Sequence, residues 1–505
     1  MPNPITLDGS SLTLADVIAV ARYGATVRLS PSAKKQMAAS RTWVERAVDD
    51  HAVVYGVTTG FGAFQSVSVE PQKLRELQRN LILSHCAGTG DPMPEEVVRA
   101  MMILRANALA KGNSGIRVST VQLLLDMLNT GVHPVVPVQG SVGASGDLAP
   151  LSHMAAVMIG EGTAYVKGKV VSGARALQSA GLQPVVLEAK EGIALNNGTQ
   201  AMTGFGVLAL DDAEHLALVA DIAGAMSLES VKGKSAPFDA RVHNARPHKG
   251  QSQSAANIRT MIRGSALVDC LDSDTLTKVQ DSYSIRCIPQ VHGASRDAMT
   301  IVRSVLETEI NSATDNPLIF PDDDVAISAG NFHGQPVALV MDYLGLAAAE
   351  LGNISERRTA KLMDHHHSYG LPPFLADNGG LQSGLMIAQY TAAALVSENK
   401  TLMHPASGDS IPTSANQEDH VSMGTIAARH ARAIIANVTR ILAIELLCAS
   451  QALEYRLQEP GNGTRSVLAI VRSVVHKLQG DRALSEDIEH IAGLIGSRRL
   501  SIGPG

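Results

Sequence analysis

Apolar residues recur at helical spacing over most of the chain beyond residue 200. Stretches in which apolar residues return every three to four positions predict helices that pack against one another. The longest of them would span roughly 55 Å if unbroken, at about 1.5 Å per residue. Helices of that length extend past a single domain core, so we expect a bundle that packs against further copies of the chain. The stretches lie at 201–230, 253–280, 296–313, 334–362, 382–403 and 421–457, with shorter ones at 464–479 and 484–498.

The part of the chain before residue 200 has a mixed pattern. Residues 52–58 and 132–138 are rich in β-branched residues and are bounded by Gly or Pro, which predicts strands or extended loops. Residues 94–112 begin with Pro and two Glu and end with Lys and Gly, so both ends of a helix are marked. A further helix is expected over 119–130, closed by Gly131.

These patterns together predict a mainly α protein with two regions. A mixed α/β region over 1–200 would be followed by a long-helix bundle with C-terminal helices over 201–505. A chain of 505 residues exceeds the usual domain size of about 150, which agrees with more than one region. Aromatic residues make up only 3% of the chain, so Leu, Val, Ala and Met must fill the core. Such side chains suit closely packed helices.

Charge and cysteine usage narrow the classes of partner. The net charge is −6 and no block of five like charges occurs, so neither nucleic acid nor a membrane surface is an expected partner. No secretory signal and no run of 18 apolar residues is visible, and a cytoplasmic protein is expected. The four cysteines are widely spaced and are expected to be reduced thiols, namely Cys86, Cys270, Cys287 and Cys448.

The most unusual segment is GSVGASGDLAPLSH at 140–153, which is rich in small residues. Its glycines do not have the spacing of a dinucleotide fingerprint, and the Lys-Ser/Thr end of a Walker loop is absent. The nucleophile elbow GxSxG is missed, because Gly146 directly follows Ser145. Composition alone favours a flexible turn.

A second interpretation of this segment has a chemical basis. In a strained Ala144-Ser145-Gly146 turn, the glycine nitrogen can attack the alanine carbonyl carbon and close a five-membered ring. Loss of two waters, one of them from the serine hydroxyl, leaves a methylidene-imidazolone. Glycine suits the attacking position because no Cβ blocks its approach. The exocyclic methylene would be an electrophile that no standard side chain supplies.

GASGDLAPLSH at 143–153 resembles the cofactor-forming signature of the aromatic amino-acid ammonia-lyase family. The resemblance extends from residue 5 to about 490, and it implies the ammonia-lyase/fumarase-like superfold with the active-site loops in the first region. It also implies 4-methylidene-imidazol-5-one (MIO) as prosthetic group, and neither metal nor nucleotide. The further matching segments, in family order, are YGVTTGFG (55–62), NLILSHCAGTGDP (80–92), LRANALAKG (104–112), NNGTQAMTG (196–204), VQDSYSIRCIPQVHGA (279–294), ATDNPLIF (313–320), GNFHGQPVA (330–338) and SANQEDHVSM (414–423).

The resemblance implies roles for individual residues in eliminating ammonia. Tyr55 would be the base that removes the β-proton. Because the usual tyrosine pKa is about 10, cationic or hydrogen-bonding neighbours are expected to lower it. Arg286 would hold the substrate carboxylate. Tyr283 and Asn197 would line the electrophile and stabilise the charge that develops on it. Gln280 and Phe332 would lie around the substrate.

The same resemblance bears on which amino acid is bound. Ser84-His85 stands where phenylalanine-specific members carry an apolar pair and tyrosine-specific members carry histidine one position earlier. Gln417-Glu418-Asp419 resembles the histidine-specific form, in which Glu418 would accept the imidazole N–H with His85 as a second polar contact. An unpaired polar group opposite a phenyl ring would disfavour the other substrates. The resemblance thus implies L-histidine as substrate, with trans-urocanate and ammonia as products.

Several alternatives remain open at this point. The chain could be a tyrosine or phenylalanine ammonia-lyase or a 2,3-aminomutase of the same family, which product analysis would distinguish. A serine hydrolase using Ser145 would retain an unmodified serine that reacts with fluorophosphonates. A silent structural relative would keep the tripeptide without turnover.

Two segments are unusual for this family, and the resemblance also implies an oligomeric state. Asn196 precedes Asn197 where the family commonly has an aliphatic residue. The three histidines 365–367 are interpreted as a polar loop, because successive positions cannot all face one metal ion. The resemblance implies a homotetramer whose active sites combine several chains. The Tyr55 loop and the Tyr283–Arg286 segment would come from subunits other than the one that carries the electrophile.

Overall fold

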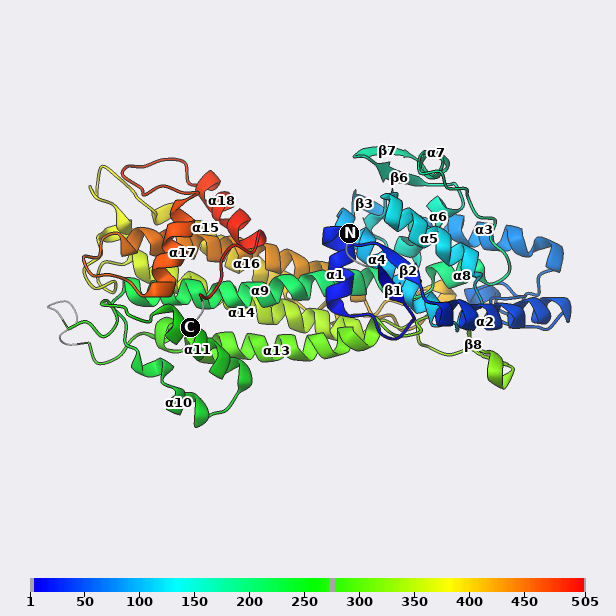
Figure 1. Cartoon of the computed structure of the whole chain (residues 1–505), viewed down its shortest axis with the longest axis horizontal. Helices are drawn as coiled ribbons and strands as arrows, with labels where there is room; N and C mark the ends of the chain where they lie inside the picture. Colours follow the sequence, from blue (N-terminus) through cyan, green and yellow to red (C-terminus); the bar gives the residue numbers. More distant parts are fainter. Residues whose placement is uncertain (1–3, 272–277, 504–505) are drawn as a thin grey trace. The chain divides into compact units, whose positions relative to one another are not determined.

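The computed structural model of the chain describes residues 4–271 and 278–503, and it is mainly helical, which confirms the expected fold class (Figure 1). Two compact units are present. The first unit combines Met1–Leu208, Arg303–Asp342 and Pro405–Arg429. The second combines Ala209–Val302, Tyr343–His404 and His430–Gly505. The first unit thus draws on three segments of the chain, whereas the sequence pattern suggested a continuous region; a domain boundary near residue 200 stays a prediction.

The first unit is a set of helices with short peripheral strands. Among its described residues, small sheets pair β1 with β2, β3 with β5, β6 with both β4 and β7, and β8 with β9. Only the β1–β2 pair is parallel. The elements are β1 (Ile5–Leu7), α1 (Leu14–Tyr23), β2 (Val27–Leu29), α2 (Pro31–Asp49), α3 (Leu74–His85), β3 (Thr89–Pro92), α4 (Glu95–Ala110), α5 (Val118–Thr130), β4 (His133–Pro134), β5 (Pro137–Gln139), α6 (Leu148–Met158), β6 (Thr163–Val166), β7 (Lys169–Ser172), α7 (Gly173–Ser179), α8 (Glu191–Asn196), β8 (Leu318–Phe320) and β9 (Val325–Ile327).

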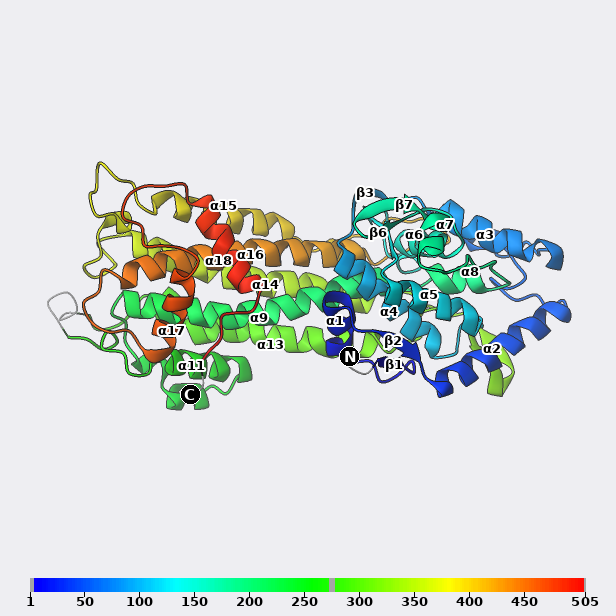
Figure 2. The same cartoon turned by 45° about the horizontal axis from the view of Figure 1, so that its top comes forward.

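Long helices dominate the second unit, where they lie side by side in Figures 1 and 2. Glu445 is fully buried among them. Its carboxylate accepts hydrogen bonds from the hydroxyls of Ser227 and Ser355 and forms an ion pair with Arg358. These partners come from two helices and Glu445 itself from a third, so the polar cluster fixes how the three helices pack. The helices with residues in this unit are α9 (Gln200–Ser230), α10 (Ala240–Asn244), α11 (Lys249–Met261), α12 (Tyr283–Arg286), α13 (Ile288–Glu309), α14 (Gln335–Met363), α15 (Met386–Leu402), α16 (Gly424–Leu453), α17 (Asn462–Arg472) and α18 (Ser485–Gly496).

Most sequence-predicted helices are confirmed within a few residues, but the one over 253–280 is too long. Helix α11 ends at Met261, and Gly264 has a left-handed φ of +79°, which an α-helix does not tolerate. The following backbone bonds instead to the start of α17, where the Asn462 N–H donates to the Arg263 carbonyl at 2.9 Å. Residues 272–277 lie outside the described part of the chain.

The stretch over 52–58, where a strand or an extended loop was expected, forms an irregular loop with turns. The Thr58 hydroxyl donates to the Ala52 carbonyl at 2.6 Å and accepts from the Val54 N–H at 3.0 Å. These local bonds use the backbone groups that a strand partner would need. In contrast, 132–138 does contain short strands, β4 and the start of β5.

Candidate active site

A tight turn presents Ala144 and Ser145 between two glycines. Gly143 and Gly146 pair across the turn and have left-handed φ values of +70° and +69°. A Cβ at Gly146 would overlap the Gly198 carbonyl, and one at Gly143 would overlap the Ser422 hydroxyl. Both positions therefore require glycine for conformation and for space.

A buried carboxylate holds this turn in place. Asp147 donates its backbone N–H to the Gly198 carbonyl at 2.6 Å. Its side chain accepts from the Ser141 hydroxyl at 3.0 Å, from the Met202 N–H at 2.8 Å and from the Thr425 hydroxyl. Burial raises the pKa of Asp147, while these hydrogen bonds act in the opposite direction. The turn is thus anchored immediately before α6 begins.

Ser145 lies on the wall of a cavity of about 950 Å³ within the first unit. Part of the wall is apolar and includes Phe61, Leu77 and Ile193. A small number of polar groups in a largely apolar concavity is typical of a small-molecule site. The sequence-predicted residues that line it are Tyr55, His85, Ser145, Asn197, Phe332, Gln417 and Glu418.

Tyr55 is half-buried in this cavity, and its phenol oxygen accepts the Gly62 N–H at 3.4 Å. Burial raises the pKa of Tyr55; the Gly62 hydrogen bond opposes this, and the charges of Glu418 and Asp315 add to the rise. The expected hydrogen-bonding neighbour is present. The expected cationic neighbour does not act on Tyr55 here, so the direction of its pKa shift differs from the sequence-based expectation.

Glu418 reaches from its own loop to the turn that carries Ser145. One carboxylate oxygen lies 3.0 Å from the Thr413 hydroxyl and the other lies 3.5 Å from the Ser145 hydroxyl. Backbone bonds between Thr413 and Glu418 close the loop that carries the carboxylate. Across the cavity, burial lowers the pKa of His85, and the Glu418 charge opposes that shift. An acidic and a neutral polar group therefore face one ligand space.

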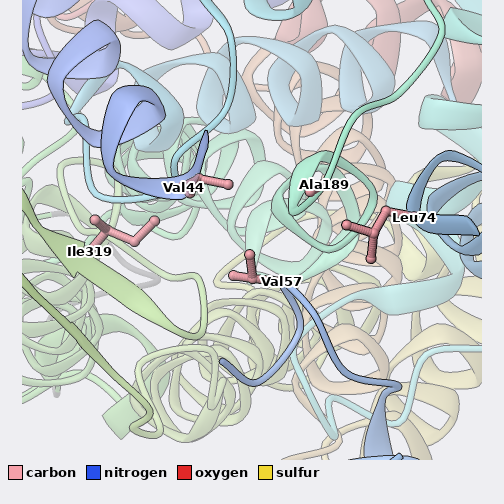
Figure 3. Close-up of a cluster of buried hydrophobic side chains, with 5 residues drawn as sticks. All are labelled: Val44, Val57, Leu74, Ala189 and Ile319. Atoms are coloured by element: carbon pink, nitrogen blue, oxygen red, sulfur yellow. The ribbon is translucent and has the colours of Figure 1, made fainter. Parts of the chain in front are cut away.

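Hydrophobic packing brings the site-bearing segments together, as Figure 3 shows. Val57 follows Tyr55, Ala189 precedes α8, and Ile319 lies in β8; all three are in one buried cluster with Val44 and Leu74. Burying these apolar side chains fixes the segments that hold Tyr55, Asn197 and Asn316. The expectation that the Tyr55 loop comes from another subunit is wrong, because this core seats the loop in the same cavity as Ser145.

Comparison with known proteins decides the family. Residues 12–473 match the family described as aromatic amino acid lyase. The chain belongs to the aromatic amino acid lyase family. It is 55% identical over 497 residues to the histidine ammonia-lyase of Caldanaerobacter subterraneus subsp. tengcongensis, covering 98% of this chain and 97% of that protein. Among solved structures it is similar to histidine ammonia-lyase from Trypanosoma cruzi (TM-score 0.91, 44% identity, 99% of this chain and 94% of that chain). It is also similar to tyrosine aminomutase from Streptomyces globisporus (TM-score 0.94, 40% identity, 99% and 98%).

Three residues that the resemblance assigned to this lyase's site do not line the cavity. Gln280, Tyr283 and Arg286 belong to the second unit. Tyr283 is 72% exposed, and the Arg286 guanidinium lies 4.7 Å from its ring centre. The Arg286 Nε has no hydrogen-bond partner within the described residues. An exposed aromatic beside an incompletely paired arginine is unusual for a surface that stays in water.

Sequence reasoning missed the buried polar groups behind the cavity. Asn316 lines it, and its side chain accepts the Ala329 N–H at 2.8 Å, which holds the segment next to Phe332. Lys190 and Asp315 form a buried ion pair nearby. Asp315 and Asn316 belong to the matched segment ATDNPLIF. Their roles depend on contacts with residues far away in the sequence, and such contacts produce no recognisable spacing of residues.

The two segments that are unusual for the family, Asn196 and the histidines 365–367, lie in different environments. Asn196 is fully buried, lines the cavity and donates to the Ser152 hydroxyl at 3.0 Å. The histidines 365–367 are exposed in a turn, which confirms their interpretation as a polar loop. Within residues 4–271 and 278–503, no group of three or more His, Cys, Asp or Glu side chains is placed to hold a metal ion.

Proposed function

We propose that the protein is a histidine ammonia-lyase that converts L-histidine into trans-urocanate and ammonia. The observation that carries the proposal is the cavity in which Glu418 reaches toward Ser145 while Tyr55 and His85 line the same space. The relatives at 53% and 55% identity that bear the name histidine ammonia-lyase support it.

The prosthetic group would be an MIO formed from Ala144, Ser145 and Gly146. The turn fits this group, since it needs glycine on both sides and Gly198 leaves no room for a side chain at 146. When formed, the group supplies an electrophile that no standard side chain provides. Asp147 and the backbone of Gly198 hold the tripeptide in the cavity wall.

Tyr55 would remove the β-proton of the substrate as the amino group leaves with its bonding electrons, which forms the carbon–carbon double bond. The Gly62 N–H, which donates to the phenol oxygen, favours the phenolate required for this role. The apolar residues around Tyr55 exclude water and so keep the abstracted proton near the reacting atoms.

Glu418 and His85 would recognise the imidazole. A carboxylate accepts the imidazole N–H, and the half-buried ring of His85 can pair with the second ring nitrogen. A phenyl or phenol ring in the same place would leave the carboxylate without its donor, at a cost of about 1–3 kcal/mol.

A tyrosine-specific ammonia-lyase or aminomutase is the second candidate, favoured by the TM-score of 0.94 with a tyrosine aminomutase. A serine hydrolase is disfavoured, because the side-chain partner of Ser145 in the described chain is a carboxylate at 3.5 Å and not a histidine.

Product analysis with L-histidine, L-tyrosine and L-phenylalanine tests the proposal directly. We expect trans-urocanate and ammonia from histidine, with kcat/KM at least about a hundredfold above that for the other two amino acids. Glu418→Gln should reduce this preference about tenfold or more, because the amide is a weaker acceptor of the imidazole N–H. A β-amino acid product, or preference for tyrosine, would reject histidine ammonia-lyase in favour of the second candidate.

We further propose that the enzyme is a homo-oligomer, a tetramer by family resemblance, in which Tyr283 and Arg286 complete the site of a neighbouring copy. The exposure of Tyr283 and the missing partner of the buried Arg286 Nε support this, and so does the absence of both residues from the lining of the cavity. Arg286 would then bind the substrate carboxylate.

Subunit mixing tests this composite site. Ser145→Ala and Tyr283→Phe should each be nearly inactive as homo-oligomers. Co-expressed in equal amounts, they should regain about one quarter of wild-type activity, because random pairing leaves that share of sites with both residues intact. If both residues served a site within one chain, the mixed oligomers would gain nothing.

The chain is expected to act in the cytoplasm without a membrane partner. Helices α14 and α16 are long and apolar enough to cross a membrane, but 67% and 72% of their most apolar windows are buried inside the structure, as in core helices. In the part of the chain that the structure describes, Cys86, Cys287 and Cys448 are free thiols, in agreement with the expected reduced state.

A further inference from the structure

A buried ion pair behind the cavity has no part in the mechanism described so far. The Lys190 Nζ lies 2.5 Å from Asp315 Oδ2, and the two side chains are 0% and 2% exposed. Burial lowers the pKa of Lys190, and the charge and hydrogen bond of Asp315 oppose that shift. Taking two charges out of water is costly and is weak evidence for a stabilising role. Stability alone therefore does not explain this buried ion pair, and its other contacts indicate its role.

The second oxygen of Asp315 is bonded to the site. Asn197 Nδ2 donates to Asp315 Oδ1 at 3.1 Å and lies 3.4 Å from the Asn316 carbonyl oxygen. Both neighbours can only accept hydrogen bonds. Turning the amide over would place its oxygen against a carboxylate and a carbonyl, so the amide orientation is fixed.

The other end of the same amide is free. Asn197 is 2% exposed and lines the cavity with Ser145, and its Oδ1 has no hydrogen-bond partner in the described chain. A buried oxygen without a donor costs about 1–3 kcal/mol unless a ligand or water pairs with it. At the cavity wall, Asn197 thus has an unpaired acceptor, while its donor group is occupied by Asp315 and Asn316.

The backbone under Asn197 is held independently. The Arg105 guanidinium is fully buried and donates to the carbonyl oxygens of Ala194 and Asn197 and to Gln200 Oε1, each at 2.9 Å. The main chain at Asn197 therefore keeps its position without Asp315. Asp315 instead determines the rotation of the Asn197 side-chain amide.

We propose that Asp315, held by Lys190, is a positioning residue that fixes Asn197 as a hydrogen-bond acceptor for the amino group of the bound substrate. The inference rests on the proposed lyase function. It differs from the expectation that Asn197 stabilises charge on the electrophile, because that role requires the N–H groups that Asp315 and Asn316 already engage. An acceptor at this place orients the amine that must leave.

Asp315→Asn is the sharpest test, since it keeps the volume and reverses the pattern of donors. Lys190 retains an acceptor in the oxygen of the new amide, whose NH2 then faces Asn197 and favours the reversed Asn197 orientation. We expect kcat/KM to fall about tenfold or more. In the inactive Ser145→Ala background, the dissociation constant of L-histidine measured by calorimetry should rise by a similar factor.

A double-mutant cycle separates positioning from general damage. If Asp315 acts through Asn197, the variant Asp315→Asn/Asn197→Ala should be no less active than Asn197→Ala alone. Additive losses, or an unchanged dissociation constant for Asp315→Asn, would overturn the proposal. Wild-type enzyme that acts only on another aromatic amino acid would instead reject the histidine assignment, and the cycle would then be measured with that substrate.

Glu191→Gln is the matched control. Glu191 follows Lys190, is fully buried and bonds to Arg117 Nε at 2.9 Å and to the Thr120 hydroxyl at 2.8 Å, but it does not line the cavity. Its loss should lower the unfolding temperature and leave kcat/KM and the dissociation constant within about twofold. A tenfold loss in this control would show that any buried ion pair here affects activity, and so would also count against the proposal.

Discussion

Replacing Ser145 by alanine is expected to lower kcat by at least about a thousandfold while changing the unfolding temperature by no more than about 2 °C. Without the serine hydroxyl the tripeptide cannot lose the second water, so the electrophile does not form. Little stability is lost, because within residues 4–271 and 278–503 the side chain of Ser145 makes a single hydrogen bond, the 3.5 Å contact to Glu418. Initial rates with L-histidine and a thermal unfolding curve check both parts.

The mass of the peptide that contains residues 144–146 identifies the cause of this loss. In the wild type it should be lighter than the sequence mass by two waters, and in Ser145→Ala the full reduction should be absent. Ser328→Ala is the control, because Ser328 lines the same cavity but is assigned no role. An active wild-type enzyme with a peptide of full mass would refute the proposed electrophile.

Replacing Tyr55 by phenylalanine is expected to lower kcat about a hundredfold to ten-thousandfold, since that is the usual contribution of a positioned acid or base. The prosthetic group should still form, because Asp147 and Gly198 hold the tripeptide without help from the phenol. A normal peptide mass combined with the loss of rate would therefore assign the effect to proton transfer. Retention of most of the wild-type rate would exclude Tyr55 as the base.

The pH profile provides a second measurement for the same residue. Burial, Glu418 and Asp315 raise the pKa of Tyr55, so the phenolate fraction and with it kcat should increase with pH below that pKa. The negative charge of Glu418 disfavours the phenolate, so Glu418→Gln should lower the pKa of Tyr55 and move this limb of the profile to lower pH. A limb that stays in place, or moves to higher pH, would show that Tyr55 is not the titrating group.

Local signals explain why most helices were predictable and why two segments were not. The Pro94 and Gly112 signals bracket α4, and the apolar periodicity marks α9, α14 and α16 to within a few residues. The segment 52–58 has the composition of a strand, but the Thr58 hydroxyl supplies its hydrogen bonds locally. The pattern over 253–280 continues past Met261, where the bond between Asn462 and Arg263 replaces the helix. This second competition depends on a partner about 200 residues away along the chain.

The sequence by itself determined the mainly helical architecture and the Ala144-Ser145-Gly146 turn, and it singled out Tyr55, His85 and Glu418, which line one cavity, because periodicity and contiguous motifs carry that information locally. Only the tertiary structure decided that Tyr55 and Ser145 share a cavity of one chain, that Gln280, Tyr283 and Arg286 do not line it, and that Asp315 orients Asn197. These facts depend on which side chains meet after distant segments pack. The apolar cluster around Val57, Ala189 and Ile319 brings those segments together by burial, which is non-directional and leaves no motif in the sequence.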